Sequence, residues 1–192
     1  MMTARVPEGN GLYPAFKEWQ AIVEALGAGE QILILRKGGL AEDEGGFRPR
    51  AGRYWLFPTT FHGQRARLKP AALARAAATP AAAGAVTLRF FAETAHQVFL
   101  TDWEMVRRLE PFHLWTETTI RERYDWGQPR GVHALLVRVH RLHSPLTSAL
   151  TAAMRGCRSW IVLPHDPAAQ PSDPVLADPA FAARRDEILA LL

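Results

Sequence analysis

The stretch GEQILILRKGGL at residues 29–40 is followed by an acidic, glycine-rich segment and then by GRYWLFPTTFHG at residues 52–63. Each quoted piece holds a short apolar run bounded by turn-forming residues, which is the pattern of a buried strand. We therefore expect strands over 31–36 and 54–57, joined by a long loop over 37–52. Loops of this length in a compact domain are usually functional or mobile.

Before this stretch, apolar residues recur at the spacing of one helix face: Phe16, Trp19, Val23 and Leu26. The spacing predicts an amphipathic helix over 14–27. Residues 1–13 contain several turn formers and predict a flexible N-terminal arm. After the stretch, Pro70 suits the first turn of a short surface helix, and the composition predicts an Ala-rich linker or insertion over 71–84.

The rest of the chain alternates between strand and helix patterns. We expect a strand pair at 86–90 and 96–100, helices at 103–109 and from Thr116, a strand at 131–142, a helix at 145–155 and a strand at 157–163. Because these elements follow no regular βαβ rhythm, the sequence favours an α+β fold. We predict a single domain over 14–163, with a central mixed or mostly antiparallel sheet flanked by helices. Residues 164–192 predict a proline-rich linker and a C-terminal helix.

The composition limits where the chain works and what it contacts. It has 192 residues, 48% of them hydrophobic, with a net charge of +4 and a pI of about 9.7. Three of its 23 basic residues are lysines and the remaining 20 are arginines, which suits phosphate contacts but also follows from a GC-rich genome. A single cysteine excludes an intrachain disulfide and fits a reducing compartment. With no apolar stretch long enough for a membrane helix, we expect a cytoplasmic protein that does not contact membranes.

Catalytic motifs are absent or incomplete. The chain has neither a Walker loop nor a G-x-G-x-x-G turn, no zinc-type Cys/His spacing, and no Asp/Glu-x-Lys pattern of restriction-type nucleases. We therefore expect no metal site. A nuclease would need a rearranged magnesium site, for example from Glu18, Glu93 and Asp102, and another hydrolase would use His113. Arginines flank Cys157, but strand alternation predicts a buried and inert thiol.

Two features of the sequence favour binding to an anion. The glycine-rich 37–52 loop, with Arg36, Lys37 and Arg53 at its ends, either cradles a substrate or phosphate or is an ordinary hairpin loop with solvated charges. Arginine pairs recur along the chain and are interleaved with six tryptophans. In nucleic-acid-binding proteins, arginines contact the phosphates and aromatic side chains stack on the bases. The alternative is that the tryptophans form the core and the arginines are evenly solvated.

Six short motifs occur in order along the chain: FKEW at 16–19, ILRKGG at 34–39, YWLFPT at 54–59, LKP at 68–70, HLWT at 113–116 and GCRSW at 156–160. In these motifs the chain resembles a bacterial family labelled only as domain of unknown function 1802, over residues 14–163. Members of that family are sometimes fused to, or found beside, restriction-endonuclease domains. The resemblance therefore implies a role in restriction or other DNA transactions, with a restriction-type protein partner. It implies no catalytic residue.

These observations lead to the hypothesis that the protein binds DNA or RNA in a restriction, defence or DNA-repair setting. The candidate nucleic-acid or anion ligands are Lys17, Arg36, Lys37, Arg53, Thr116, Arg158 and Ser159. The sequence favours a binding protein over an enzyme. The alternatives are a hydrolase that uses Glu18 or His113, with magnesium as the cofactor if it is a nuclease, and an adaptor whose tail recruits a protein partner.

Overall fold

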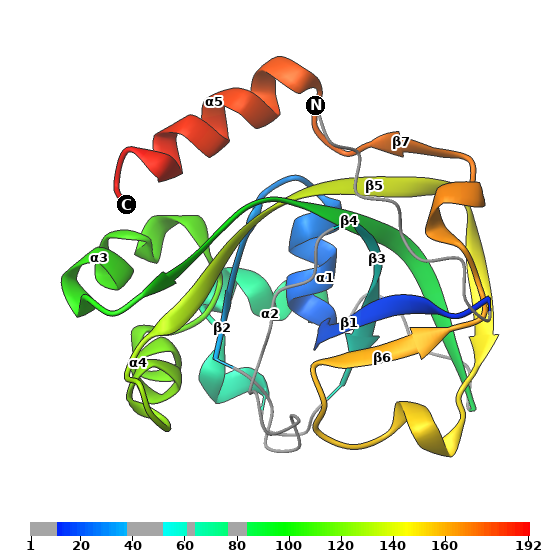
Figure 1. Ribbon diagram of the computed structural model, residues 1–192, viewed down its shortest axis with the longest axis horizontal. Coiled ribbons are helices and arrows are strands. Elements are labelled where there is room, and N and C mark those ends of the chain that lie inside the picture. Colours follow the sequence, from blue (N-terminus) through cyan, green and yellow to red (C-terminus); the bar gives the residue numbers. More distant parts are fainter. Residues whose placement is uncertain (1–10, 38–51, 61–63, 77–83) are drawn as a thin grey trace.

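A computed structural model describes residues 11–37, 52–60, 64–76 and 84–192 of the chain (Figure 1). Most of the expected N-terminal arm and of the expected 37–52 loop lies outside the described residues, as does half of the Ala-rich segment. Among the helices that the structure describes, none is both long and apolar enough to cross a membrane.

Within the described residues, seven strands form one mixed sheet in the order β2-β5-β4-β3-β1-β6, with β7 paired to β5. The strands are β1 Tyr13–Trp19, β2 Leu33–Arg36, β3 Arg53–Thr59, β4 Ala85–Leu100, β5 Val132–Ala149, β6 Trp160–Leu163 and β7 Ser172–Pro174. The pair β1 and β3 is parallel, and the other pairs are antiparallel. The helices are α1 Gln20–Gly27, α2 Pro70–Ala76, α3 Trp103–Arg108, α4 Glu117–Asp125 and α5 Asp178–Leu189. The expected α+β single domain is confirmed.

The prediction of one helix over 14–27 was wrong in its first half. Residues Tyr13–Trp19 form β1, and only Gln20–Gly27 are helical. β1 lies inside the sheet, parallel to β3 and antiparallel to β6, and four consecutive residues from Ala15 are buried. Burial on both faces removes the alternation that marks a strand, so the spacing of Phe16 and Trp19 resembled a helix face by coincidence.

The strand pair expected over 86–100 is one long strand, β4. Its pairing with β5 shifts register between Thr94 and His96, at the interval that separates the two expected strands. A bulge adds an unpaired residue without reversing the strand. The break in the alternation of apolar residues therefore has a structural cause, but that cause is a bulge in the pairing of β4 with β5 and not a hairpin.

The helix expected over 145–155 was also wrong, because β5 continues to Ala149. A second register shift occurs here: Leu88 pairs with Leu146, while Phe90 pairs with Arg141. Pro145 lies in the stretch of β5 that this shift leaves out of the ladder, where its missing N–H breaks no hydrogen bond. A single 3-10 turn, Ala152–Met154, replaces the remainder of the expected helix.

Other helix boundaries follow the sequence closely. α2 begins at Pro70, as expected, and the Thr116 side chain accepts a hydrogen bond from the Thr119 N–H at the start of α4. The helix expected near 103–109 is α3, but its cap is Asp102, whose side chain accepts from the Glu104 N–H.

The core lies on both faces of the curved sheet. Figure 1 shows α1 within the curve, surrounded by strands, and seven of its eight residues are buried. This side forms the larger apolar cluster, and the smaller cluster on the other side includes Trp55, Phe57 and Met154. Trp55 and Trp115 are fully buried, as a core role requires, whereas half of the Trp126 side chain is exposed.

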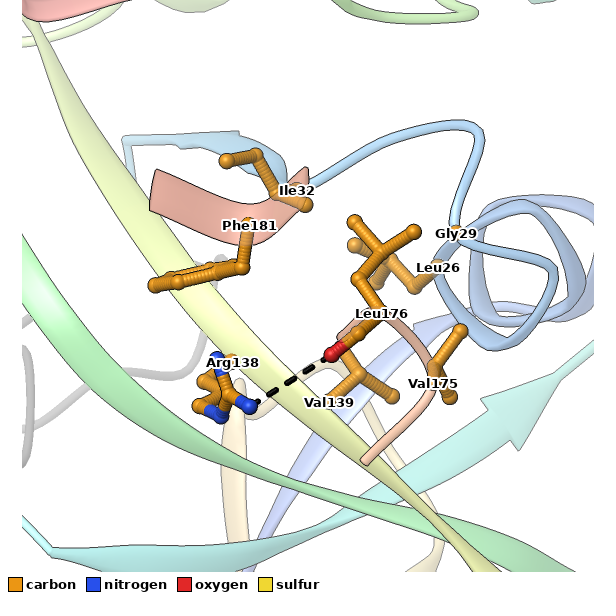
Figure 2. A pocket seen from close by; sticks show the side chains of 8 residues that line it. All are labelled: Leu26, Gly29, Ile32, Arg138, Val139, Val175, Leu176 and Phe181. Carbon is orange, nitrogen blue, oxygen red and sulfur yellow. Dashed lines mark hydrogen bonds between the residues drawn. The ribbon is translucent and has the colours of Figure 1, made fainter. Parts of the chain in front are cut away.

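The segment after β6 packs against the sheet. β7 pairs with β5, and α5 adds Phe181 and Ile188 to the larger cluster. Arg184 of α5 donates to the carbonyls of Gly29 and Glu30, at 2.6 and 2.9 Å. Figure 2 shows a neighbouring part of this packing, where Leu176 and Phe181 lie against residues of α1 and β5 around a gap of about 10 Å³. A gap of that size holds one water at most, so the packing is close.

Candidate functional site

The turn at residues 155–159, just before β6, gathers side chains from two distant segments. Lys17 Nζ donates to the carbonyls of Met154 and Gly156, at 3.0 and 2.6 Å. From β2, Arg36 donates through Nε and Nη2 to Ser159 Oγ, at 3.1 and 2.9 Å. Three of the residues predicted as anion ligands are thus brought together: Lys17, Arg36 and Ser159.

The contact between Arg36 and Ser159 also joins the two edges of the sheet. β2 and β6 are the first and last strands in the sheet order, yet a residue at the end of β2 bonds to the residue that precedes β6. The sheet therefore curls toward a barrel, and the Arg36 guanidinium lies across the seam, 5.5 Å from the Phe16 ring centre. Ser159 is fully buried beneath it.

Lys17 is a nearly buried cation without an acidic partner. It is 9% exposed, and no ion pair joins it to a carboxylate within the described residues. Burial lowers the pKa of its ammonium group, Cys157 nearby raises it, and the positive charge of Arg36 lowers it further.

Two more arginines project from the turn itself. Arg155 and Arg158 are exposed, and neither side chain has a hydrogen bond or ion pair in the part of the chain that the structure describes. Between them Gly156 has a φ of 87°, a left-handed conformation that glycine adopts without strain. We refer to Lys17, Arg36, Arg155 and Arg158 as the basic turn cluster.

The expectation of a buried Cys157 was wrong. Cys157 is exposed, because β6 begins only at Trp160 and the cysteine lies in the turn that precedes it. Strand alternation was therefore applied to residues that are not in the strand.

Glu18 points away from Lys17, to the opposite side of β1. It is fully buried; its Oε1 accepts a hydrogen bond from the Trp19 N–H at 2.8 Å, and its Oε2 has no partner among the described residues. The nearby Arg123 of α4 donates to the Leu35 carbonyl at 2.8 Å. Burial lowers the pKa of Arg123 to about 10, and the Glu18 carboxylate opposes that effect.

Sequence reasoning missed the position of Arg123. Its guanidinium carbon lies 3.8 Å from the centre of the Trp115 ring, the distance of a cation–π contact. A signal for it was present, because Arg123 follows the buried Thr119 and Ile120 by four and three residues. That spacing places it on the inward face of α4.

His113 is buried beside the same arginine. It is 4% exposed, and its Nδ1 has no hydrogen-bond partner among the described residues. Burial, assisted by the positive charges of Lys69 and Arg123, lowers the pKa of His113 to about 3, while the Trp115 backbone opposes the shift. The imidazole is therefore neutral near pH 7, where a general base with a pKa of about 3 is inefficient.

The other predicted ligands lie elsewhere. Arg53 forms an ion pair with Glu93 of β4. It lies five residues before Pro58, which is the residue of β3 that pairs with Glu18. Five residues of a strand span about 16 Å, so Arg53 lies far from the basic turn cluster. Thr116 serves as the cap of α4. Lys37 bonds to the Pro129 carbonyl and lies 5.2 Å from the Phe99 ring centre, at the far end of β4.

The rearranged magnesium site is not assembled. Glu93 is paired with Arg53, and Asp102 caps α3, so neither carboxylate approaches Glu18. In the described ranges, no group of three His, Cys, Asp or Glu residues is placed to hold a metal ion.

Comparisons with known proteins place the chain in a family. No curated protein matches it. The crystal structure of ASCH from Zymomonas mobilis is similar with a TM-score of 0.40 and 14% sequence identity, over 69% of this chain and 68% of that one. The sequence model of the family described as a domain of unknown function, DUF1802, matches residues 15–187. The chain therefore belongs to the DUF1802 family.

Proposed function

We propose that this protein binds nucleic acid by holding backbone phosphates at the basic turn cluster. The observation that carries the proposal is the pair of exposed arginines, Arg155 and Arg158, on the same short turn that fixes Lys17 and Arg36. Arginine guanidinium groups suit the geometry of phosphate oxygens, and no acidic residue neutralises this pair within the described residues. Both DNA and RNA supply such phosphates.

A salt series tests the proposal directly. Labelled 20-mers of single-stranded and double-stranded DNA and RNA are titrated by fluorescence anisotropy between about 50 and 200 mM salt, because phosphate contacts release counterions and make the affinity steeply salt-dependent. The double substitution Arg155→Ala/Arg158→Ala should weaken binding. It should also make the slope of log affinity against log salt shallower by about 1.4 to 1.8, which is the loss of two phosphate contacts.

A charge-matched control separates the site from the overall charge. Arg107→Ala/Arg108→Ala removes two exposed arginines from α3, which lies at the opposite side of the molecule from β6 (Figure 1). This variant should bind as the unaltered protein does. Equal weakening by the two double substitutions would contradict the proposal, as would binding that is insensitive to salt.

The same samples, run on a gel with and without magnesium, test the rival functions. Cutting that requires a divalent ion and is abolished by Glu18→Gln would support a hydrolase in place of a binding protein. Absence of binding to every nucleic acid, together with stable co-purification of a second protein, would support the adaptor.

The proposal includes a restriction, defence or DNA-repair setting and a restriction-type protein partner, which rest on the family's association with restriction-endonuclease domains. In a restricting host, a strain that lacks this gene should accept unmodified DNA more readily than its parent. Equal transformation of both strains by modified and unmodified DNA would contradict the setting without affecting the binding proposal.

A further inference from the structure

A groove of about 500 Å³ opens beside the basic turn cluster. It lies at the carboxyl ends of the parallel strands β1 and β3, between the start of β4 and the segment that follows β5. Its lining includes Lys17, Thr59, Thr87, Arg89 and Arg155. Its size is within the range of about 300–1,000 Å³ that is typical of small-molecule sites.

The floor of the groove is apolar. Phe57, Val86 and Met154 line it, and all three belong to the smaller core cluster, which fixes their positions. A planar ring can rest on such a surface, and a thioether beside a ring is a favourable contact. Thr59 and Thr87 also line the groove, so its lining combines apolar and polar residues.

The cations at the groove differ in how far they are neutralised. Arg89 forms an ion pair with Glu24, whereas Lys17 and Arg155 have no carboxylate among the described residues. An ammonium group has three donors, and two of those of Lys17 are used by the Met154 and Gly156 carbonyls. A nearly buried charge without a counter-ion is costly, and a bound anion at the groove would supply one.

We propose that the groove binds one unpaired nucleotide, with its phosphate at Lys17 and Arg155 and its base over Phe57 and Met154. This inference rests on the proposed nucleic-acid binding and makes it specific. A groove of this volume admits a single nucleotide, but a base that remains paired and stacked in a duplex cannot enter it. The protein should therefore prefer single strands, in which unpaired bases are free to leave the stack.

The first experiment titrates the whole protein with adenosine 5′-monophosphate, adenosine and inorganic phosphate by isothermal calorimetry. The monophosphate should bind more tightly than either part. Lys17→Met, which keeps an unbranched side chain without the charge, should weaken monophosphate binding by about tenfold or more. Its melting temperature is measured alongside, because the substitution also removes the hydrogen bonds from Lys17 to the Met154 and Gly156 carbonyls. Unchanged monophosphate affinity in this variant would overturn the inference.

A second variant leaves every cation in place. Thr87→Trp fills the groove, and Thr118→Trp, on the exposed side of α4, is its control. Thr87→Trp should abolish both monophosphate binding and the preference for single strands, while salt-dependent strand binding at Arg155 and Arg158 persists. If the control has the same effect, or if Thr87→Trp has none, the groove is not the site.

The outcomes separate this inference from the function on which it rests. Strand binding that depends on Arg155 and Arg158, with no binding of the monophosphate, would overturn the nucleotide groove and leave the proposed function standing. Inorganic phosphate bound as tightly as the monophosphate would show an anion site without base recognition, which also overturns the inference. Failure of all nucleic acids to bind would overturn both.

Discussion

Lys17 and Glu18 are neighbours in the chain with opposite surroundings. Strand geometry sends consecutive side chains to opposite faces, so the ammonium meets carbonyls of the 155–159 turn while the carboxylate meets Arg123 of α4. The sequence identified both residues through one motif, but it could not separate their roles, because β1 was predicted as a helix. The same error prevented the sequence from indicating the site of Arg123, because its partners Leu35 and Glu18 come from the strands β2 and β1.

The pH dependence of stability tests the environment of His113. Its pKa is about 3 in the folded protein against an ordinary value of 6.5, so between these values only the unfolded chain takes up the proton. The contribution of His113 to the free energy of unfolding is complete above pH 6.5 and is lost as the pH falls toward 3. We expect His113 to account for about 2 kcal/mol of the fall in unfolding free energy between about pH 7.5 and 5.

Urea unfolding at a series of pH values measures this effect in the unaltered protein and in His113→Gln. The variant should lose less stability over the same pH interval. His96→Gln, at an exposed ring, is the matched control and should follow the unaltered protein. Parallel pH profiles for the protein and His113→Gln would show that His113 is not buried as described.

At the scale of elements, the sequence predicted short segments with clear boundaries and failed where strands are long or fully buried. α2 and α4 were found because Pro70 and Thr116 mark helix starts through local chemistry. β4 and β5 were divided because their bulges contain turn-forming residues, including Pro145 in β5. Each strand continues across its bulge because it pairs with a partner strand on both sides of the bulge. A local sequence pattern does not show which strand that partner is.

The seam between the sheet edges gives a prediction about elements. Ser159→Ala removes the acceptor of two hydrogen bonds from the Arg36 guanidinium in a buried site. Bonds to a charged group contribute about 1.5–3 kcal/mol, so the urea midpoint should fall accordingly. Thr151→Ala removes an exposed hydroxyl that makes no capping bond and should leave the midpoint unchanged. A stable Ser159→Ala variant would mean that the seam does not depend on this contact.

At the scale of the whole molecule, residues near the two ends of the described chain meet in the core. Phe181 of α5 packs in the same cluster as Leu26 of α1, and Arg184 bonds to the carbonyl of Gly29. The sequence predicted the α+β class, because the class depends on the kinds of element present. It did not predict the sheet order, which places β1 between β3 and β6 through contacts between distant residues.

Phe181→Ala tests whether the C-terminal helix is energetically part of the domain. Phe181 is 6% exposed, and truncation of a buried phenylalanine costs about 3–5 kcal/mol. Urea unfolding followed by tryptophan fluorescence should show one transition, moved to a lower midpoint. Val162→Ala, at an exposed apolar side chain, should move it little. Two separate transitions, or an unchanged midpoint for Phe181→Ala, would show that α5 is a peripheral addition.

The place of β1 in the sheet also has a consequence for biosynthesis. One edge of β1 is covered by β6, which is made only after more than two thirds of the chain. At ordinary rates of translation, the ribosome needs roughly ten seconds to extend the chain from β1 to β6. Throughout that interval the nascent chain carries an apolar strand with an open edge, which other chains can pair with. A ribosome stalled before β6 would therefore present a natural client for a chaperone that shields unpaired strands.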